Sequence, residues 1–453
     1  MVNLPITEGE GGSKHEKLRL SDGINKKHIA ADSLTLGPVS VVVIGAGERG
    51  RVYSEYGLSF PEKMRVVGVA EPRERWRRWM AERYGISSSN IFEDWSEVFE
   101  RERFADAVII ATPDRLHADP ATAAAKRGYH ILLEKPMAPT EEECRSIVDA
   151  VVENNVIFSV CHVLRHTNYT RELKRLIESG ELGDIISIQH LEPVGHWHQA
   201  HSFVRGNWRR SDESSSMLLA KSCHDVDWIR YVIGTRCKSV ASFGYLSHFR
   251  KEMRPVDAAD RCLDCPVSVE ERCPYSAKKI YRGFLEKGIK GWPVEVVTED
   301  LDEGGLDIAL RVGPYGRCVY ACDNDVVDNQ VTIMEFEGGK TASFTMTAFT
   351  EAAPRKTRVF GTRGEVDADG RYIRVFNFLD NKWTVMDTVR DEHDLVGHEG
   401  GDLGVVEKFV EAVRFNDASR ILTGPYETLE SHLIVFAAER SRVERKVIEI
   451  SLN

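Results

Sequence analysis

The chain has 453 residues, of which 42% are hydrophobic, and this length is enough for two domains of ordinary size. Its 71 acidic residues outnumber its 60 basic residues, and the net charge of −11 argues against nucleic acid or an anionic membrane surface as a partner. No apolar run approaches the roughly 20 residues that a membrane-spanning helix needs.

The N-terminal segment, residues 1–37, is polar and rich in Gly, Ser and Lys, and it has no apolar core of a signal peptide. We expect this segment to be a disordered extension. The nine cysteines, in a chain without an export signal, fit a reducing compartment. The sequence therefore predicts a cytoplasmic protein.

A glycine-rich turn follows the first apolar strand of the chain. Gly45-Ala46-Gly47-Glu48-Arg49-Gly50 comes directly after the run from Val39 to Ile44. In this spacing the first glycine permits a tight turn, the second lets a pyrophosphate approach the backbone, and the third lets a helix pack on the strand. The N-terminus of that helix offers N–H groups to the phosphates. The pattern predicts a dinucleotide site, with an accidental glycine-rich turn as the alternative.

The next apolar run ends in an acidic residue. Glu71 stands 26 positions after Gly45, where a carboxylate can accept hydrogen bonds from the ribose hydroxyls of an adenosine. The same carboxylate would repel a 2′-phosphate, which favours NAD. Arg73 and Arg75 lie close by and would attract that phosphate, so NADP stays open as the alternative.

Short apolar runs then alternate with helical stretches, which is typical of a parallel sheet with crossover helices. The helices are expected at 73–84, 119–126 and 140–154, and the strands at 107–111, 129–133 and 157–160. This alternation predicts a Rossmann domain at residues 38–163.

The pattern changes after this domain. Residues 185–189, 331–336 and 341–347 alternate between apolar and polar, with a hairpin turn at Gly338-Gly339. Helices are expected at 171–178, 403–414 and 427–440. The predicted fold class is α/β, an N-terminal Rossmann parallel sheet followed by an α+β domain with an open, mostly antiparallel sheet at residues 164–453.

Three motifs in order carry a resemblance to a known family. Gly45-Ala46-Gly47, Ala111-Thr112-Pro113-Asp114-x-x-His117 and Glu134-Lys135-Pro136 resemble those of the glucose-fructose oxidoreductase/inositol dehydrogenase/MocA family. The resemblance covers nearly all of residues 39–445. It implies that the second domain lies over the nicotinamide and often mediates oligomerisation, so we expect a homo-oligomer through the C-terminal sheet.

The resemblance also implies a set of cofactor-binding residues. They are Gly45, Ala46, Gly47, Glu48, Arg49, Gly50, Glu71, Thr112, Pro113, His117, Glu134 and Lys135.

Lys135 is the first candidate for catalysis. It follows a buried strand, at the carboxyl edge where ligands bind in such sheets. A lysine that is desolvated beside a nicotinamide cation can exchange a proton with a substrate hydroxyl. Glu134 could orient it, and Pro136 fixes the turn through a peptide bond that is often cis in the family. A surface lysine at the end of a strand is the alternative.

A second candidate group begins at Lys221. Related dehydrogenases carry a D-x-G-x-H-x-x-D pattern here, and His224 and Asp227 match its second half. Ala220 stands in place of the first acid and Ser222 in place of the glycine. Either Lys221 supplies the missing polar group, or His224 relays the hydroxyl proton together with the lysine of the preceding motif. The alternative is a histidine whose hydrogen bonds are satisfied within its helix.

A loop-like stretch around His196-Trp197-His198 supplies donors and flat aromatic faces, which hydroxylated sugars need. Structural packing is the alternative, and a metal site lacks carboxylates at convincing ligand spacing. The substrate-contact candidates are Arg165, His198, His201, Trp208 and Asp227.

Five cysteines lie in two short stretches, Cys262-x-x-Cys265-Pro266 with Cys273, and Cys318-x-x-x-Cys322. Irregular segments of this kind are often stabilised by a zinc ion with four thiolates, and an iron–sulfur cluster or free thiols are the alternatives. The fourth ligand must come from 45 or more residues away.

These features predict an NAD(P)-dependent oxidoreductase that transfers a hydride between nicotinamide and a carbinol carbon of a sugar, cyclitol or related polyol. The altered pattern at Ala220 leaves two other hypotheses open. One is a glycosidase or lyase of the same fold that recycles bound NAD, and the other is a non-catalytic NAD-binding regulatory protein.

Overall fold

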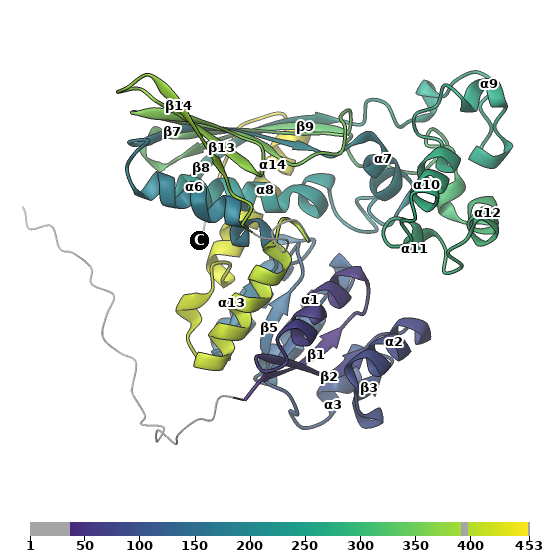
Figure 1. Ribbon diagram of the computed structural model, residues 1–453, viewed down its shortest axis with the longest axis horizontal. Helices are drawn as coiled ribbons and strands as arrows, with labels where there is room; N and C mark the ends of the chain where they lie inside the picture. Colours follow the sequence, from purple (N-terminus) through teal and green to yellow (C-terminus); the bar gives the residue numbers. More distant parts are fainter. Residues whose placement is uncertain (1–36, 391–396, 452–453) are drawn as a thin grey trace, which may run out of the picture. The chain divides into compact units, whose positions relative to one another are not determined.

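The computed structural model of the chain describes residues 37–390 and 397–451 (Figure 1). The predicted disordered extension at residues 1–37 lies outside the described residues, Gly37 excepted. In the described part of the chain, every helix is too short or too polar to pass through a bilayer.

The first sheet has six parallel strands in the order β3-β2-β1-β4-β5-β6. The order in which strands are added to the sheet reverses between β1 and β4, and ligands of such sheets bind in the crevice outside the carboxyl ends of the strands at this point. The strands are β1 (Val39–Ile44), β2 (Met64–Ala70), β3 (Ile91–Phe92), β4 (Ala107–Ile110), β5 (His130–Leu133) and β6 (Phe158–Val160).

Crossover helices cover both faces of this sheet, so strands such as β4 are buried throughout. Local chemistry fixes where the helices begin, as at Thr140, whose side chain accepts a hydrogen bond from the backbone N–H of Glu143 (3.2 Å). The helices are α1 (Glu48–Ser59), α2 (Glu74–Tyr84), α3 (Trp95–Glu100), α4 (Ala118–Lys126) and α5 (Glu141–Glu153).

The second sheet has nine strands in the order β14-β13-β12-β11-β7-β10-β9-β8-β15, and all its described pairs are antiparallel except β7 with β10. The predicted fold class is thereby confirmed. The strands are β7 (Ile185–Pro193), β8 (Cys237–Tyr245), β9 (Asn329–Phe336), β10 (Thr341–Thr347), β11 (Lys356–Gly361), β12 (Gly364–Ala368), β13 (Tyr372–Asn377), β14 (Lys382–Asp387) and β15 (Ile448–Glu449).

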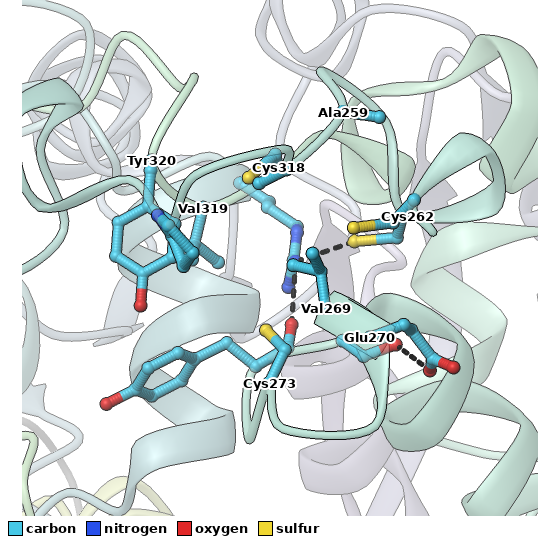
Figure 2. Close-up of a pocket in the computed structure, with 14 residues that line it drawn as sticks. Ala259, Cys262, Val269, Glu270, Cys273, Cys318, Val319 and Tyr320 are labelled. Atoms are coloured by element: carbon cyan, nitrogen blue, oxygen red, sulfur yellow. Dashed lines mark hydrogen bonds between the residues drawn. The ribbon is translucent and has the colours of Figure 1, made fainter. Parts of the chain in front are cut away.

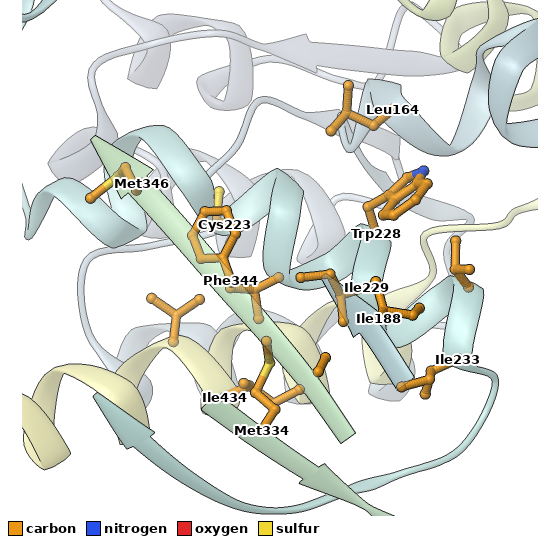
Figure 3. Close-up of a cluster of buried hydrophobic side chains, with 14 of the residues drawn as sticks. Leu164, Ile188, Cys223, Trp228, Ile229, Ile233, Met334, Phe344, Met346 and Ile434 are labelled. Carbon is orange, nitrogen blue, oxygen red and sulfur yellow. The ribbon is translucent and has the colours of Figure 1, made fainter. Parts of the chain in front are cut away.

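One face of the second sheet packs on helices α6 (Asn168–Glu178), α8 (Met217–Ile233) and α14 (Pro425–Glu444) (Figure 1). Figure 3 shows Trp228 and Ile229 of α8 in the same buried cluster as Phe344 of β10. The other face exposes large apolar side chains, among them Phe243 on β8 and Ile333 on β9, which are 68% and 53% exposed.

The chain returns to the first domain near its C-terminus. Val405 and Phe409 of α13 (Gly401–Phe415) are buried in one cluster with Val41 of β1, and Leu433 of α14 is buried with residues of α5. Both late helices were expected at these positions. Their contribution to the core of the first sheet depends on contacts that are distant in sequence.

An insert, residues 246–328, separates β8 from β9. It carries the short helices α9 (Val267–Glu270), α10 (Ala277–Glu286), α11 (Val294–Val297) and α12 (Glu303–Val312). Its own buried cluster includes Tyr281, Leu306 and Leu310, together with Ala200 and Val204 from an earlier segment.

That earlier segment corrects one prediction. The sequence predicts a loop-like stretch around His196-Trp197-His198, whereas the structure has a short helix α7 (His196–His198) that continues as a π-helical turn, Gln199–Arg205. Trp197, Ala200 and Val204 recur at helical spacing and pack against the insert, which explains the helix.

Candidate active site

The three glycines of the first turn have different surroundings. Gly45 has a φ of +89°, and a Cβ there would lie 2.7 Å from the carbonyl oxygen of Ala111. A Cβ on Gly50 would lie 2.0 Å from the carbonyl oxygen of Gly45. At Gly47, by contrast, the nearest atom to such a Cβ is Nη2 of Arg73 at 3.8 Å. The protein itself requires Gly45 and Gly50, while Gly47 keeps space open beside the backbone, as a pyrophosphate would need.

Helix α1 begins directly after this space. Gly47 is its N-cap residue and provides no side-chain cap, and Glu48, the first residue of the helix, is exposed. The first backbone N–H groups of α1 therefore point to the open space with the positive end of the helix dipole, which suits an anion.

Glu71 is almost fully buried at the end of β2. Its carboxylate accepts hydrogen bonds from the backbone N–H of Ala46 (2.8 Å) and from Nε and Nη2 of Arg73 (2.7 and 2.9 Å). Burial raises the pKa of Glu71, but the hydrogen bonds from Arg73 and Ala46 outweigh it and leave the pKa below its usual range. Glu71 is thus a fixed anion tied to the glycine turn.

A histidine joins the loop after β4 to the loop after β5, at the carboxyl edge of the first sheet. The ring nitrogens of buried His117 lie 2.8 Å from the carbonyl oxygens of Thr112 and Pro136. The peptide bond between Lys135 and Pro136 is cis, as the family resemblance implied. Pro113 starts a short 3₁₀ turn between these points. His117 therefore positions the two loops that frame the edge of the sheet.

Glu134 is turned into the protein. Its carboxylate accepts a hydrogen bond from the hydroxyl of Tyr53 (2.7 Å) and lies 3.6 Å from Nε of Arg49. Arg49 also donates to both carboxylate oxygens of Asp402 (2.6 and 3.1 Å). This network links α1, β5 and α13, and it leaves the charge of Lys135 without a carboxylate from its own motif.

Lys135 meets the start of helix α8. Its Nζ donates a hydrogen bond to the carbonyl oxygen of Ala220 (2.7 Å). His224, one helical turn further on, is 5% exposed, and its Nδ1 has no hydrogen-bond partner among the described residues. Burial, followed by the charge of Lys135, holds the pKa of His224 well below its usual range. The sequence-predicted pair is thus adjacent, with a neutral imidazole and an unused ring nitrogen.

Lys221 has a carboxylate of its own. Its Nζ lies 3.1 Å from Oε1 of Glu192 on β7, and Oε2 of Glu192 lies 3.1 Å from Nε of Arg355. Arg355 also pairs with Asp225 of α8 (2.5 Å). The charge of Lys221 is therefore balanced within the protein.

Arg165 and Asp227 of α8 form a buried ion pair whose hydrogen bonds are made within the protein. Nε and Nη2 of Arg165 donate to the two carboxylate oxygens of Asp227 at 2.7 and 2.6 Å, and Oγ of Ser431 donates to the same carboxylate at 2.7 Å. Both side chains of the pair are at most 2% exposed. Their polar atoms are directed to each other, which suits a positioning role better than contact with a substrate.

The other substrate candidates separate into two groups. His198 is half-buried, and desolvation of its ring, followed by the charge of Lys221, holds its pKa well below the usual range. Trp208 is 36% exposed, with its indole N–H 3.3 Å from the carboxylate of Asp114. His201 instead lies in the core of the insert, where its Nδ1 is 2.8 Å from the hydroxyl of Tyr281.

A further histidine reaches the site from near the C-terminus. The ring centroid of His398 lies 6.1 Å from that of His224, and its Nδ1 is 3.0 Å from Oδ1 of Asp402. Burial raises the pKa of Asp402, but the hydrogen bond with His398 and the charge of Arg49 outweigh it and hold the pKa far below its usual range. His398 has a φ of +46°, in a run of four left-handed residues, 397–400, and such strained backbone is typical of functional sites. The glycines around it were the only signal in the sequence.

The cysteines lie in the insert and its surroundings. Cys262, Cys265, Cys273 and Cys318 line one cavity, whereas Cys322 does not line it (Figure 2). Over residues 37–390 and 397–451, no three His, Cys, Asp or Glu side chains are arranged to hold a metal ion. The predicted zinc site is therefore not formed with these side-chain positions.

Two family models match most of the chain. Residues 39–162 match "Oxidoreductase family, NAD-binding Rossmann fold", and residues 174–450 match "Oxidoreductase family, C-terminal alpha/beta domain". The chain belongs to this glucose-fructose oxidoreductase/inositol dehydrogenase/MocA family, as the motifs predicted. Its first domain is the family's NAD-binding domain.

Individual relatives are more distant. The chain is 30% identical over 204 residues to a levoglucosan dehydrogenase of Pseudarthrobacter phenanthrenivorans. This match covers 43% of this chain and 51% of the relative. It is 27% identical over 202 residues to a 2,7-anhydro-N-acetylneuraminate hydratase of Escherichia coli, covering 45% and 51%. The chain thus spans about half the length of these curated relatives. A solved structure of levoglucosan dehydrogenase in complex with NADH has the same fold, with a TM-score of 0.67 and 20% identity over 91% of this chain and 99% of that chain.

Proposed function

We propose that the chain transfers a hydride between nicotinamide C4 and a carbinol carbon of a sugar, cyclitol or related polyol. The observation that carries this proposal is Lys135, which lies at the carboxyl edge of the first sheet beside neutral His224. The family assignment supports it, since relatives include sugar and inositol dehydrogenases.

NAD would supply the hydride acceptor at this edge, and the protein would supply its binding and the proton transfer. Gly47 would leave room for the pyrophosphate, the N-terminus of α1 would hold the phosphates, and Glu71 would face the ribose. Thr112 and Pro113 stand at the next strand end, where the nicotinamide would lie in such a fold.

The amine of Lys135 is the group that accepts the hydroxyl proton as the substrate is oxidised, and its ammonium form returns the proton in reduction. The hydrogen bond to the carbonyl oxygen of Ala220 fixes its position. His224 and the pair of His398 with Asp402 offer a path for the proton toward solvent, because the His398 side chain is 40% exposed. This pair would replace the first acid of the motif, whose position Ala220 occupies.

We further propose NAD as the preferred cofactor. Arg73 is hydrogen-bonded to Glu71, and Arg75 pairs with Glu299 (3.3 Å), so each arginine already has a carboxylate partner that a 2′-phosphate would have to displace. Glu71→Ser should release Arg73 and shift the ratio of kcat/KM for NAD over NADP toward NADP. A ratio that is unchanged in this variant would remove the assignment of Glu71.

The direct test is a panel of sugars, cyclitols and sugar acids with NAD and NADP, followed by the absorbance of the reduced nicotinamide in both directions. We expect turnover with at least one polyol or its keto form. NAD binding without turnover on the whole panel would contradict the proposal and favour a regulatory protein.

Recycling of bound NAD is the second candidate function. Two ion pairs join the insert to the first domain beside the glycine turn, Arg51 with Glu295 (2.8 Å) and Arg75 with Glu299 (3.3 Å), and they would slow the release of a dinucleotide. The relationship to a hydratase favours the same candidate. NAD that copurifies with the protein, together with conversion of an anhydro-sugar or glycoside without net NADH, would identify it.

The exposed face of the second sheet is the surface that we propose for a homo-oligomer. Ile186 on β7, Phe243 on β8 and Ile333 on β9 are 51%, 68% and 53% exposed, and β10 lies between β7 and β9 in this sheet. Large apolar side chains exposed on one sheet face are typical of a protein–protein interface. Phe243→Asp should lower the oligomer mass in light scattering. The nine free cysteines are consistent with a cytoplasmic location.

A further inference from the structure

Four thiols from two distant stretches of the insert surround one cavity. Cys262, Cys265 and Cys273 come from the first stretch and Cys318 from the second, and together they line a cavity of about 20 Å³ (Figure 2). This volume holds one water molecule or one ion, because a water molecule needs about 10–15 Å³ by the same measure. It is too small for an iron–sulfur cluster.

A buried arginine lines the same cavity. Arg205 is 1% exposed, and it donates hydrogen bonds to the carbonyl oxygens of Arg317 (2.7 Å) and Tyr275 (2.8 Å) and to Sγ of Cys262 (3.5 Å). Its Nη1 has no hydrogen-bond partner among the described residues. The carboxylate of Glu270 also lines the cavity, but it accepts a hydrogen bond from Oγ of Ser276 (2.7 Å) and pairs with Nζ of Lys278 (3.4 Å). Among the described residues, no carboxylate forms a hydrogen bond or ion pair with Arg205.

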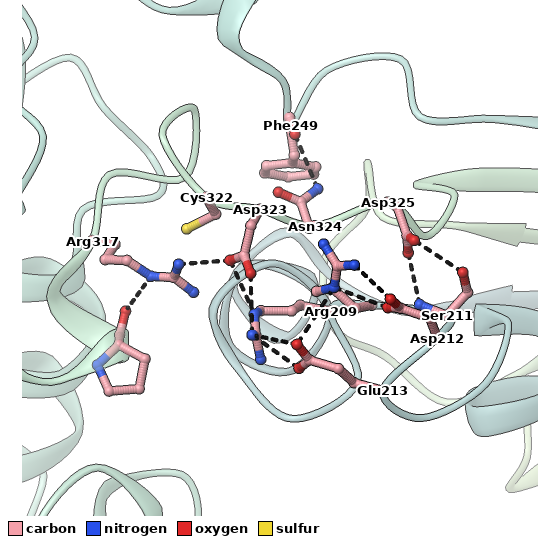
Figure 4. Close-up of polar contacts among 12 residues, drawn as sticks. Arg209, Ser211, Asp212, Glu213, Phe249, Arg317, Cys322, Asp323, Asn324 and Asp325 are labelled. Carbon is pink, nitrogen blue, oxygen red and sulfur yellow. Dashed lines mark hydrogen bonds and ion pairs between the residues drawn. The ribbon is translucent and has the colours of Figure 1, made fainter.

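Neighbouring arginines have the carboxylate that Arg205 lacks. Arg209 and Arg317 share Asp323, with N–O distances of 3.0 and 2.6 Å (Figure 4). Asp323 follows Cys322 in the chain, and Cys322, whose Sγ lies 3.3 Å from the carbonyl oxygen of Cys318, is not one of the residues that line the cavity.

A buried guanidinium without an anion is costly. Arginine keeps its proton in proteins, and an uncompensated buried charge destabilises a fold by several kcal/mol. Neutral thiols cannot balance the charge of Arg205. Thiolates bound to a divalent metal can, because four thiolates and one divalent ion carry a net charge of −2.

We propose that Cys262, Cys265, Cys273 and Cys318 bind one zinc ion, with Arg205 as the counter-charge that donates a hydrogen bond to a ligand sulfur. Binding converts four thiols and Zn²⁺ into a tetrathiolate site and releases four protons to solvent. The side chains must rotate so that the sulfur atoms come within about 4 Å of one another, since zinc–sulfur bonds measure about 2.3 Å. The ion would fix short, irregular elements such as α9 and the Cys262–Asp264 turn.

The test compares two cysteines that are four residues apart. Full-length protein is purified without chelator, supplied with Zn²⁺ under reducing conditions, desalted, and analysed for zinc by mass spectrometry. We expect about one zinc per chain in the wild type and in Cys322→Ser, and a loss of most zinc in Cys318→Ser. A wild type without zinc would overturn the proposal, as would an equal loss in both variants.

Two further measurements guard against a Cys318→Ser variant that does not fold. Wild-type protein loaded with Co²⁺ should show the intense visible absorption and the sulfur-to-metal charge transfer of a tetrahedral thiolate site. Arg205→Met should weaken zinc binding by about 10–100-fold, as is usual for groups that support metal ligands, while Arg205→Lys keeps part of the affinity. Octahedral cobalt spectra in the wild type, or unchanged zinc affinity in Arg205→Met, would contradict the site.

Discussion

His224 and Asp227 are three positions apart in helix α8 and have opposite surroundings. Asp227 is closed, because Arg165 and Ser431 use both of its carboxylate oxygens at 2.6–2.7 Å. His224 is open, because its Nδ1 has no partner among the described residues and its neighbour Lys135 meets only a carbonyl oxygen of the helix. One helix thus carries a satisfied ion pair and a pair of polar groups with unused capacity.

The difference separates residues that stabilise the fold from residues that can react with a substrate. A buried ion pair whose hydrogen bonds are complete holds the fold, and its removal leaves a buried charge. Perturbed titratable groups with unused hydrogen-bonding atoms at a sheet edge are the ones that can act on a substrate. The following predictions test this contrast between Lys135 and His224 on one side and Arg165 and Asp227 on the other.

The largest expected effect is on the open side. Lys135→Ala should lower kcat by about 10²–10⁴-fold, the usual contribution of a general acid or base, without weakening NAD binding. Lys126→Ala, an exposed lysine on α4, is the matched control and should leave kcat unchanged. Equal turnover in both variants would take the catalytic role from Lys135.

Removing one partner of the buried pair of Arg165 and Asp227 should lower the stability of the fold. Asp227→Ala should lower the free energy of unfolding in urea by about 3–5 kcal/mol, because it leaves Arg165 charged and buried. Glu55→Ala removes an exposed pair with Arg83 (3.0 Å) and should cost less than about 1 kcal/mol. Similar losses in both variants would mean that the buried pair has no special role.

The glycine turn offers the same contrast at smaller scale. Gly50→Ala should destabilise the fold by about 1–3 kcal/mol, because its Cβ would meet the backbone of Gly45 at 2.0 Å. Gly47→Ala should keep the stability and weaken NAD binding about tenfold, which is about 1.4 kcal/mol. Calorimetry of both variants checks this. NAD affinity that survives in Gly47→Ala would remove the pyrophosphate site from this turn.

Lowering the pH should gradually lower the free energy of unfolding, because several histidines are buried in the neutral form. Burial lowers the pKa of His162 and His166 to about 3, and that of His432 to about 4. The unfolded chain, with a histidine pKa of about 6.5, then binds more protons than the folded chain at intermediate pH, so this stability is complete above pH of about 6.5 and falls as the pH drops toward these values.

Each such histidine contributes about 1.4 kcal/mol per pH unit within this window. Urea unfolding at several pH values measures the slope, and His162→Gln should reduce it by the share of one histidine. A free energy of unfolding that is constant from pH of about 6.5 down to about 5 would contradict the neutral, buried state of these histidines.

The sequence predicts the local features of this molecule well. Apolar runs predict most strands of the first sheet and β7, β9 and β10 of the second, the helix expected at 140–154 is α5, and Gly338-Gly339 forms the predicted hairpin turn with φ values of +78° and +75°. These features depend on neighbours in the chain. The helical spacing of Trp197, Ala200 and Val204 is a local signal of the same kind, and it indicates the helix that the structure has there.

The rest depends on contacts between distant residues. His224 and Asp227 belong to one motif, and only their partners, Lys135 and Arg165, distinguish an open group from a closed one. His201 resembles His198 in sequence but lies in the core of the insert. His398 reaches the site from near the C-terminus, and no spacing rule connects it to the other motifs.

The central claim is that the edge around Lys135 transfers a hydride. The most direct test uses NADH deuterated at nicotinamide C4, on either face, with a panel of keto-sugars and keto-cyclitols, and mass spectrometry of the products. We predict that one face delivers its deuterium to the carbinol carbon of at least one product with the wild type, and that Lys135→Ala abolishes the transfer. Bound NADH that transfers no deuterium from either face to any member of the panel would contradict the claim.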